Sequence, residues 1–184
     1  MELNQLIVCK QLNDANDSVL NLVEKTYTDS FPREERRDFP LVKELIRSNP
    51  YFKIYILTKS GQYVGFISAW TFGTYTYAEH FAIEPAYRNG GIGAEALRQF
   101  LAAVNSPVVL EVEMPTDEMS KRRIGFYQRQ GFVLDDHVYF QPPYRPAEES
   151  VLEMRLMTYG ALDLNSDFAA VRDCIHSNVY GVTL

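Results

Sequence analysis

Apolar residues recur along the chain with two different periods, which predict an interleaved series of strands and helices. Residues 51–58 and 63–72 are rich in β-branched and aromatic side chains and flank the turn sequence KSGQ, so they predict a β-hairpin. Further strands are predicted at residues 5–10, 77–85, 106–115, 132–140 and 150–159. The predicted strands are distributed over both halves of the chain.

Helical spacing of apolar residues, three and four apart, marks the segments between these strands. One helix is predicted from Asn16 to Thr28, and a second begins after Asp38, which suits an N-cap, and ends before Pro50. The remaining helices are predicted at 92–104, at 117–131 with Gly131 near the C-cap, and in the tail through Leu164, Phe168, Val171 and Ile175. The order β-α-α-β-β-β-α-β-α-β-β plus a C-terminal helix predicts an α/β (or α+β) fold with a mixed sheet flanked by helices.

Composition narrows the classes of protein. The 184 residues suffice for one buried core, and the net charge of −6 argues against a binder of nucleic-acid backbones. No apolar run approaches the roughly 18 residues of a membrane span. Cys9 and Cys174 form no disulfide framework, and His80, His137 and His176 fall in no metal-ligand pattern, so no metal is expected. The first residues lack a signal peptide's pattern, so a cytoplasmic location is expected.

The stretch YRNGGIGAEAL, residues 87–97, places three glycines within four positions directly before a helix. A helix N-terminus offers free N–H groups to an anion, and glycine lets a phosphate approach the backbone closely. Arg88 adds a positive charge. The sequence lacks the lysine of a nucleoside-triphosphate loop and the glycine spacing of a dinucleotide fold. By itself the loop is equally consistent with a structural turn.

A second motif makes the glycine loop more specific. FAIEPAYRNGGIGAEAL, with Arg88, Gly91 and Gly93, resembles the acyl-CoA motif of the GCN5-related N-acetyltransferase (GNAT) superfamily. RRIGFYQRQGF, about 30 residues later, is similar to the second hallmark of that superfamily. The resemblance spans roughly residues 3–158. It implies a domain at 1–160 with a splayed central sheet, followed by a helical tail at 161–184 that packs on the domain or forms a dimer interface.

The resemblance also implies which residues bind the acyl donor, acetyl-CoA. The expected contacts are Phe81, Ala82, Ile83, Arg88, Asn89, Gly90, Gly91, Ile92, Gly93 and Ala94. Backbone N–H groups near Ile83 would stabilise the developing oxyanion. Many relatives carry asparagine where this chain has Ser120, so a contact to the pantetheine arm is expected to differ.

The attack of an amine on a thioester needs a proton donor for the thiolate and a proton acceptor for the amine. Tyr127 matches the tyrosine that donates this proton in the family, and its phenol stays protonated at neutral pH. Glu79 lies where the family often places a carboxylate that acts as a base, directly or through water. Glu111 and Glu113 are alternatives on the next strand. A solvated strand end is the competing interpretation for all three carboxylates.

These residues predict an acetyl-CoA-dependent N-acetyltransferase that acts on a primary amine by direct transfer in a ternary complex. The alternatives are a non-catalytic acyl-CoA-binding or regulatory module and a structural interaction protein. The sequence SFPREERRDF corresponds to the family's loop beside the acceptor site, although it is equally consistent with a solvated turn. QPPY at 141–144 resembles bacterial members. The acceptor is not specified, and the chain is expected to be a monomer or a homodimer.

Overall fold

The computed structural model describes residues 7–14, 17–145 and 151–182. The chain divides into two compact units. The first combines Met1–Thr71 with Ala78–Asn105, and the second combines Phe72–Tyr77 with Ser106–Leu184. Each unit has its own strands, helices and buried side chains.

The first unit contains an antiparallel set of strands, as the hairpin pattern predicts. β1 (Ile7–Gln11), β2 (Phe52–Lys59) and β3 (Gln62–Thr71) are neighbours in that order, followed by β4 (Thr76–Ile83), whose first two residues belong to the second unit. Tyr55 pairs with Ile67, and the register shifts by a bulge between Leu57 and Thr58. The core of this unit includes the fully buried Leu57, Phe66 and Trp70.

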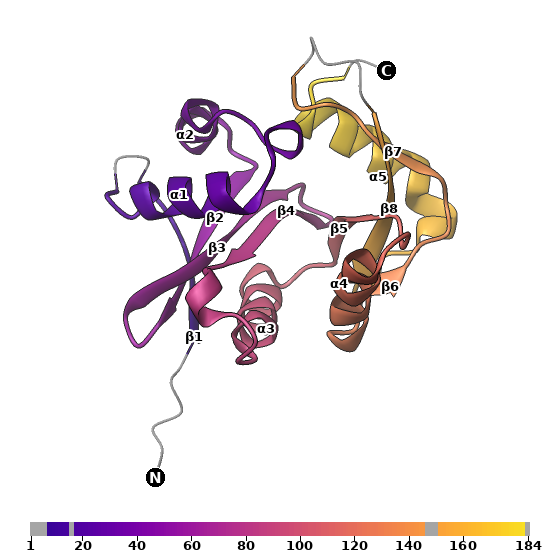
Figure 1. Ribbon diagram of the computed structural model, residues 1–184. Coiled ribbons are helices and arrows are strands. Elements are labelled where there is room, and N and C mark those ends of the chain that lie inside the picture. The colour runs from indigo at the N-terminus through magenta and orange to yellow at the C-terminus, as the bar shows by residue number, and fades with distance from the viewer. Residues whose placement is uncertain (1–6, 15–16, 146–150, 183–184) are drawn as a thin grey trace. The chain divides into compact units, whose positions relative to one another are not determined.

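Helices cover both faces of these strands. α1 (Leu20–Ser30) and α2 (Phe39–Ser48) lie on one side, and α3 (Ile92–Val104) lies on the other (Figure 1). Two short 3₁₀ helices, which the apolar pattern does not predict, are η1 (Arg33–Glu35) between α1 and α2 and η2 (Pro85–Tyr87) between β4 and α3. α1 and α2 are thus joined by a short ordered loop, residues 31–38.

The second unit is built around one long strand. β8 (Leu152–Tyr159) pairs antiparallel with β5 (Val108–Glu113), with β6 (Val133–Leu134) and with β7 (Tyr139–Gln141). α4 (Glu118–Arg129) follows β5, and α5 (Leu164–Val179) runs alongside β7 and β8 (Figure 1). α5 contributes Val171 and Ile175 to the core of this unit, so the amphipathic pattern of the tail is satisfied here by burial.

The structure confirms the predicted mixed α/β fold with its C-terminal helix. Asp38 stands at the N-cap of α2, although its side chain makes no capping hydrogen bond, and Gly131 follows α4 with φ of 91°. Asn16 and residues 5–6, within the predicted first helix and first strand, lie outside the described residues. In the described part of the chain, no helix combines the length and apolar character of a membrane span.

The predicted single strand at 132–140 is wrong. The structure divides it into β6 and β7, because a local polar turn interrupts the ladder. The Asp135 carboxylate accepts hydrogen bonds from the His137 backbone N–H at 2.9 Å and lies 3.0 Å from the His137 ring. Arg155 then donates to the His137 carbonyl at 2.8 Å. These bonds satisfy the backbone without strand pairing.

Candidate active site

The glycine loop turns sharply and leaves its backbone open. Asn89 and Gly91 both have left-handed φ angles, of 64° and 74°, and Gly91 is the N-cap residue of α3. A Cβ added at Gly90 or Gly91 would meet no heavy atom within 4 Å. Since the first N–H groups of a helix have no intrahelical partner, this open backbone suits a phosphate-sized anion. The residues present therefore fit the pyrophosphate of an acyl-CoA.

Side chains near the loop partly offset the negative charge in the first turn of α3. Glu95 is the acidic residue of the first turn of α3, and Arg98 and Gln99 hold its carboxylate by hydrogen bonds of 2.6 to 3.0 Å. Arg88 is exposed, and its Nε donates to the Ile83 carbonyl at 2.8 Å. That bond links the loop to the end of β4.

The end of β4 is packed closely against β3. A Cβ at Gly65 on β3 would collide with the Ala82 carbonyl oxygen, so this position requires glycine. The Glu84 N–H donates to the Val64 carbonyl at 2.9 Å, directly before η2. Ala82 is buried, whereas Phe81 and Ile83 are half-buried. The last residues of β4 thus hold a fixed position relative to the strand before it.

Tyr127 lies in an aromatic group near the end of α4. Its ring centroid is 5.2 Å from that of Phe126 and 5.5 Å from that of Phe132. Burial raises the pKa of Tyr127 to about 12, with the nearby Arg123 charge opposing the shift. Among the described residues, none forms a hydrogen bond with the Tyr127 hydroxyl. This phenol is protonated throughout the neutral range and has its donor available.

Ser120 has a structural partner that explains its presence. The Asp117 side chain accepts from the Ser120 N–H at 2.8 Å, and the Asp117 N–H donates to Ser120 Oγ at 3.2 Å. This reciprocal capping box starts α4, and Ser120 is buried within it. The hydroxyl that replaces the family's asparagine is therefore engaged in helix capping.

Glu79 is buried in an ion pair within the first unit. Its side chain is 1% exposed and its Oε1 pairs with Arg37, whose side chain is 8% exposed. Its Oε2 accepts from the Trp70 Nε1–H at 3.0 Å. Burial alone would raise the pKa of Glu79, but the Arg37 charge and the adjacent His80 outweigh burial, and the pKa is lowered. The interpretation as a solvated strand end is wrong for Glu79, and its role as a base stays a prediction.

Glu111 forms a second buried cluster, in the second unit, that the sequence did not predict. Its carboxylate accepts hydrogen bonds from Tyr139, from Gln141, and from the Tyr180 hydroxyl at 2.8 Å. Tyr180 in turn lies 3.3 Å from the Tyr77 hydroxyl. Burial raises the pKa of Glu111, although these hydrogen bonds oppose the shift. Its partners come from three separate segments, so no sequence spacing signals the cluster.

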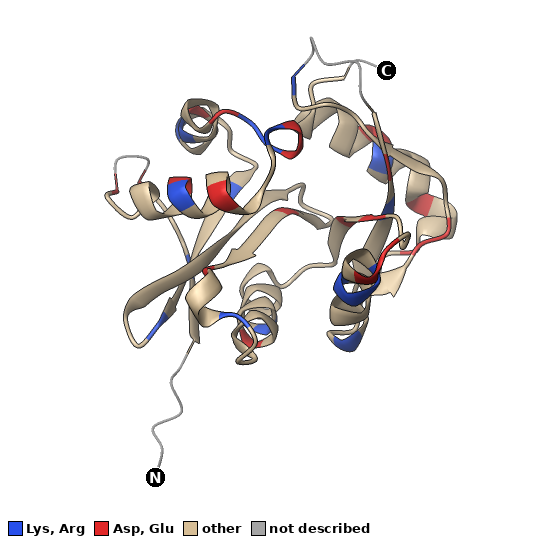
Figure 2. Ribbon diagram, in the orientation of Figure 1, with Lys and Arg blue, Asp and Glu red and all other residues tan. Residues whose placement is uncertain are grey.

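Glu113 differs from both buried carboxylates. It is two-fifths exposed and pairs with Arg123 of α4 at 2.8 Å. The interpretation as a solvated strand end therefore holds for Glu113 and is wrong for Glu111. Figure 2 shows acidic positions on β4 and β5, and neither of these two strands carries a Lys or Arg.

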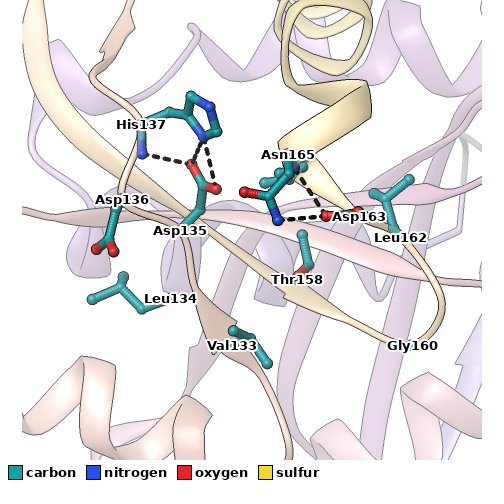
Figure 3. A pocket seen from close by; sticks show the side chains of 11 residues that line it. Val133, Leu134, Asp135, Asp136, His137, Thr158, Gly160, Leu162, Asp163 and Asn165 are labelled. Atoms are coloured by element: carbon teal, nitrogen blue, oxygen red, sulfur yellow. Dashed lines mark hydrogen bonds and ion pairs between the residues drawn. The ribbon is translucent and has the colours of Figure 1, made fainter.

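A pocket of about 480 Å³ opens elsewhere in the second unit, between the β6–β7 turn and the start of α5 (Figure 3). Asp135 and His137 face each other on one side, and Asp163 holds Asn165 on the other. Asp163 also accepts from the Asn165 backbone N–H at 3.0 Å as the N-cap of α5. Neither Tyr127 nor the glycine loop lines this pocket. Within the described residues, no group of His, Cys, Asp and Glu is arranged to hold a metal ion.

Comparison with known proteins gives the family. Residues 16–132 match the model of the acetyltransferase (GNAT) family. The chain belongs to this family. A GNAT-family protein of Bacteroides thetaiotaomicron is 38% identical, with a TM-score of 0.91 over 95% of this chain and 99% of its own. Family membership makes the chain an acetyltransferase and confirms the resemblance in its two motifs.

More distant GNAT structures share the fold. The ribosomal-protein-S18-alanine N-acetyltransferase of Escherichia coli is 15% identical, with a TM-score of 0.59 over 84% of this chain and 93% of its own. Arabidopsis thaliana Naa50, solved with the bisubstrate analogue CoA-Ac-MVNAL, is 17% identical, with a TM-score of 0.58 over 83% and 98%. No curated protein matches the chain. The GNAT family takes its acetyl group from acetyl-CoA and delivers it to an amine.

Proposed function

We propose that this GNAT enzyme transfers the acetyl group of acetyl-CoA to a primary amine by direct attack within a ternary complex. The observation that carries the proposal is the open backbone at Gly90 and Gly91, directly before α3 and beside the exposed Arg88. This arrangement supplies N–H donors and a positive charge to a pyrophosphate without displacing any side chain. Asn89, Ile92, Gly93 and Ala94 complete the proposed binding loop.

Acetyl-CoA, when bound, supplies an activated thioester, and the residues of this chain then orient it and move protons. We propose that the backbone of Phe81, Ala82 and Ile83 contacts the acyl arm and donates to the developing oxyanion. Tyr127 donates the proton of its phenol oxygen to the departing thiolate. The available hydroxyl and the raised pKa of Tyr127 support this role, because the group still carries its proton when it is needed.

The proton acceptor for the amine remains a prediction with several candidates. Glu79 directly or through water, Glu111, Glu113 and water alone are each compatible with amine acetylation. Glu113 is the exposed carboxylate of the three, whereas Glu79 and Glu111 are buried with hydrogen-bond partners on both oxygens. The acceptor is proposed only as a primary amine, since the structures solved with peptide-like ligands share no more than the fold.

The proposal also covers the setting of the reaction. Cys9 and Cys174 are free thiols in the structure, in keeping with a reducing, cytoplasmic compartment. The relative from Bacteroides thetaiotaomicron supports a bacterial source. No contact to nucleic acid is proposed, and a monomer and a homodimer are both compatible with the described residues.

The experiment that tests the function is thiol release from acetyl-CoA by the purified chain across a panel of amines. The panel includes polyamines, amino sugars, amino acids and peptides with free N-termini. We expect thiol release and the matching acetylated amine, detected by mass spectrometry, for at least one class. Binding of acetyl-CoA without thiol release for any amine would instead support the non-catalytic module.

A further inference from the structure

Two consecutive residues of β4 hold the loop between α1 and α2. The ion pair of Glu79 reaches Arg37, the penultimate residue of loop 31–38. The His80 Nε2 lies 3.0 Å from the Glu35 carbonyl, and since a carbonyl only accepts, this nitrogen carries the proton. The Nδ1 of the same ring lies 3.2 Å from the Ser68 hydroxyl. We call Arg37, Glu79 and His80 the loop clasp.

The rest of the loop is packed around this clasp. The Arg37 N–H donates to the Tyr27 hydroxyl at 2.9 Å, and the Arg37 guanidinium lies 5.5 Å from the centre of the Trp70 ring. The Phe31 ring stands edge-on to the His80 ring at 4.7 Å. Residues 33–38 of this loop are all acidic or basic, and Figure 2 shows both colours between α1 and α2, yet Arg37 is buried among these partners. The buried ion pair is therefore one of several contacts that fix the position of the loop.

A base must reach the proton that it takes, directly or through one water. Both oxygens of Glu79 are already held, one by Arg37 and the other by Trp70. If Glu79 took up a proton, the buried Arg37 guanidinium would lose the charge of the carboxylate with which it pairs, which is strongly unfavourable. This environment suits a carboxylate whose charge is fixed and whose task is structural.

We propose that Glu79 is a positioning residue, which fixes loop 31–38 through Arg37 as one wall of the acceptor site, and that it does not accept the proton of the amine. The inference rests on the proposed function and on the resemblance in the sequence, which implies that this loop borders the acceptor. The amine proton then leaves to water or to one of the other two carboxylates, Glu111 and Glu113. Loss of the clasp should raise the KM for the amine more than it lowers kcat, because the loop orients the acceptor and takes no part in bond making.

A double-mutant cycle distinguishes this role from that of a base. Glu79→Gln removes the carboxylate that pairs with Arg37, and Arg37→Met removes the guanidinium that pairs with Glu79. We expect each single variant to lose about tenfold to a hundredfold in kcat/KM for the amine. The double variant, which has no unpaired buried charge, should recover most of that loss. A base would give a double variant no more active than Glu79→Gln, and that result would overturn the proposal.

The pH profile gives a second discriminating readout. With a positioning role, Glu79→Gln keeps the shape of the wild-type profile of kcat/KM at a lower level. With a base, activity would recover as pH rises and the free amine accumulates, which would count against the proposal. Glu24→Gln is the matched control, because it removes a more exposed ion pair with Lys43 at 3.5 Å on the same pair of helices. We expect it to leave both KM and kcat unchanged.

Limited trypsin digestion follows the loop itself and needs no turnover. Arg33 and Arg36 lie in loop 31–38, and mass spectrometry identifies cleavage after each. We expect faster cleavage in Glu79→Gln and a return toward the wild-type rate in the double variant. Should Arg37→Met fail to fold, Arg37→Gln, which is also uncharged, completes the cycle. Unchanged cleavage in Glu79→Gln would overturn the proposal, whereas a wild-type enzyme that acetylates no amine would refute only the proposed function.

Discussion

At the scale of single residues, Tyr127 offers the most direct test of the chemistry. Tyr127→Phe keeps the ring between Phe126 and Phe132 and removes only the hydroxyl. We expect kcat to fall by about 10²- to 10⁴-fold, with acetyl-CoA affinity nearly unchanged. Steady-state kinetics and calorimetry measure the two quantities. Tyr159→Phe is the control, since Tyr159 also packs on Phe132 and has no proposed role. A normal kcat would mean that water or another residue donates the proton to the departing thiolate.

The protonation state of Tyr127 makes a prediction about alkaline pH. Burial raises its pKa to about 12, so the phenol keeps its proton up to the practical limit of the assay. Both enzymes are followed from pH 7 to about 10. We expect the kcat of the wild type to show no alkaline fall that is missing from the Tyr127→Phe variant. A fall with a midpoint below pH 10 in the wild type alone would contradict a phenol that stays protonated.

The sequence alone indicates the candidate residues, but it does not indicate which side chains surround them in the fold. The glycine loop and Tyr127 are recognisable because their chemistry depends on residue type at fixed spacing. The partners of Glu79 and Glu111 are not, because Arg37 lies 42 positions before Glu79 and Tyr180 lies 69 positions after Glu111. Alternation along a strand says which side a carboxylate faces, but it does not say which cation or hydroxyl meets it there.

At the scale of elements, the turn into α3 is the proposed binding site of the acyl donor. Gly91→Glu puts a side chain and a negative charge into the open space before the helix. We expect acetyl-CoA binding, measured by calorimetry, to weaken at least a hundredfold. Gly61→Glu is the matched control, because Gly61 has a left-handed φ of 79° and equally open surroundings, so it bears the same backbone strain. Equal acetyl-CoA affinity in the two variants would mean that the glycine loop does not bind acetyl-CoA.

A hydrogen bond links the residue that follows α5 to β5. Tyr180, directly after α5, donates to Glu111 at 2.8 Å. Tyr180→Phe should destabilise the fold by about 1–3 kcal/mol, because a buried carboxylate loses one of its donors. Urea denaturation measures the change. A difference under about 0.5 kcal/mol would mean that water or a neighbouring hydroxyl replaces the donor.

The elements themselves were largely predictable because periodicity is a local property. The hairpin, α3, α4 and α5 follow their apolar patterns closely. The segment 132–140 was predicted wrongly because its two apolar groups, 132–134 and 138–140, were taken as one strand, whereas the Asp135 side chain between them forms a turn. The short helices η1 and η2 were not predicted, since three residues around a proline give no periodic signal.

At the scale of the whole molecule, the two buried carboxylates should act oppositely on stability as pH falls. The pKa of Glu79 is lowered on folding, so its contribution is present above the unfolded value of about 4.3 and is lost on acidification below it. The pKa of Glu111 is raised, so the folded state gains as pH falls through the folded value. Urea unfolding from pH 7 to 3 measures both effects. The difference in free energy of unfolding between wild type and Glu79→Gln should shrink as the pH falls, whereas the difference between wild type and Glu111→Gln should grow. Parallel trends would contradict these environments.

The central claim is direct transfer from acetyl-CoA to an amine without an acetylated enzyme. Initial velocities measured while both substrates vary test it most directly, together with the intact mass of the chain after incubation with acetyl-CoA alone. For direct transfer we expect intersecting double-reciprocal lines and an unchanged mass of the chain, because both substrates must be bound before the thioester breaks. Parallel lines and a chain that carries one acetyl group and passes it to added amine would contradict it.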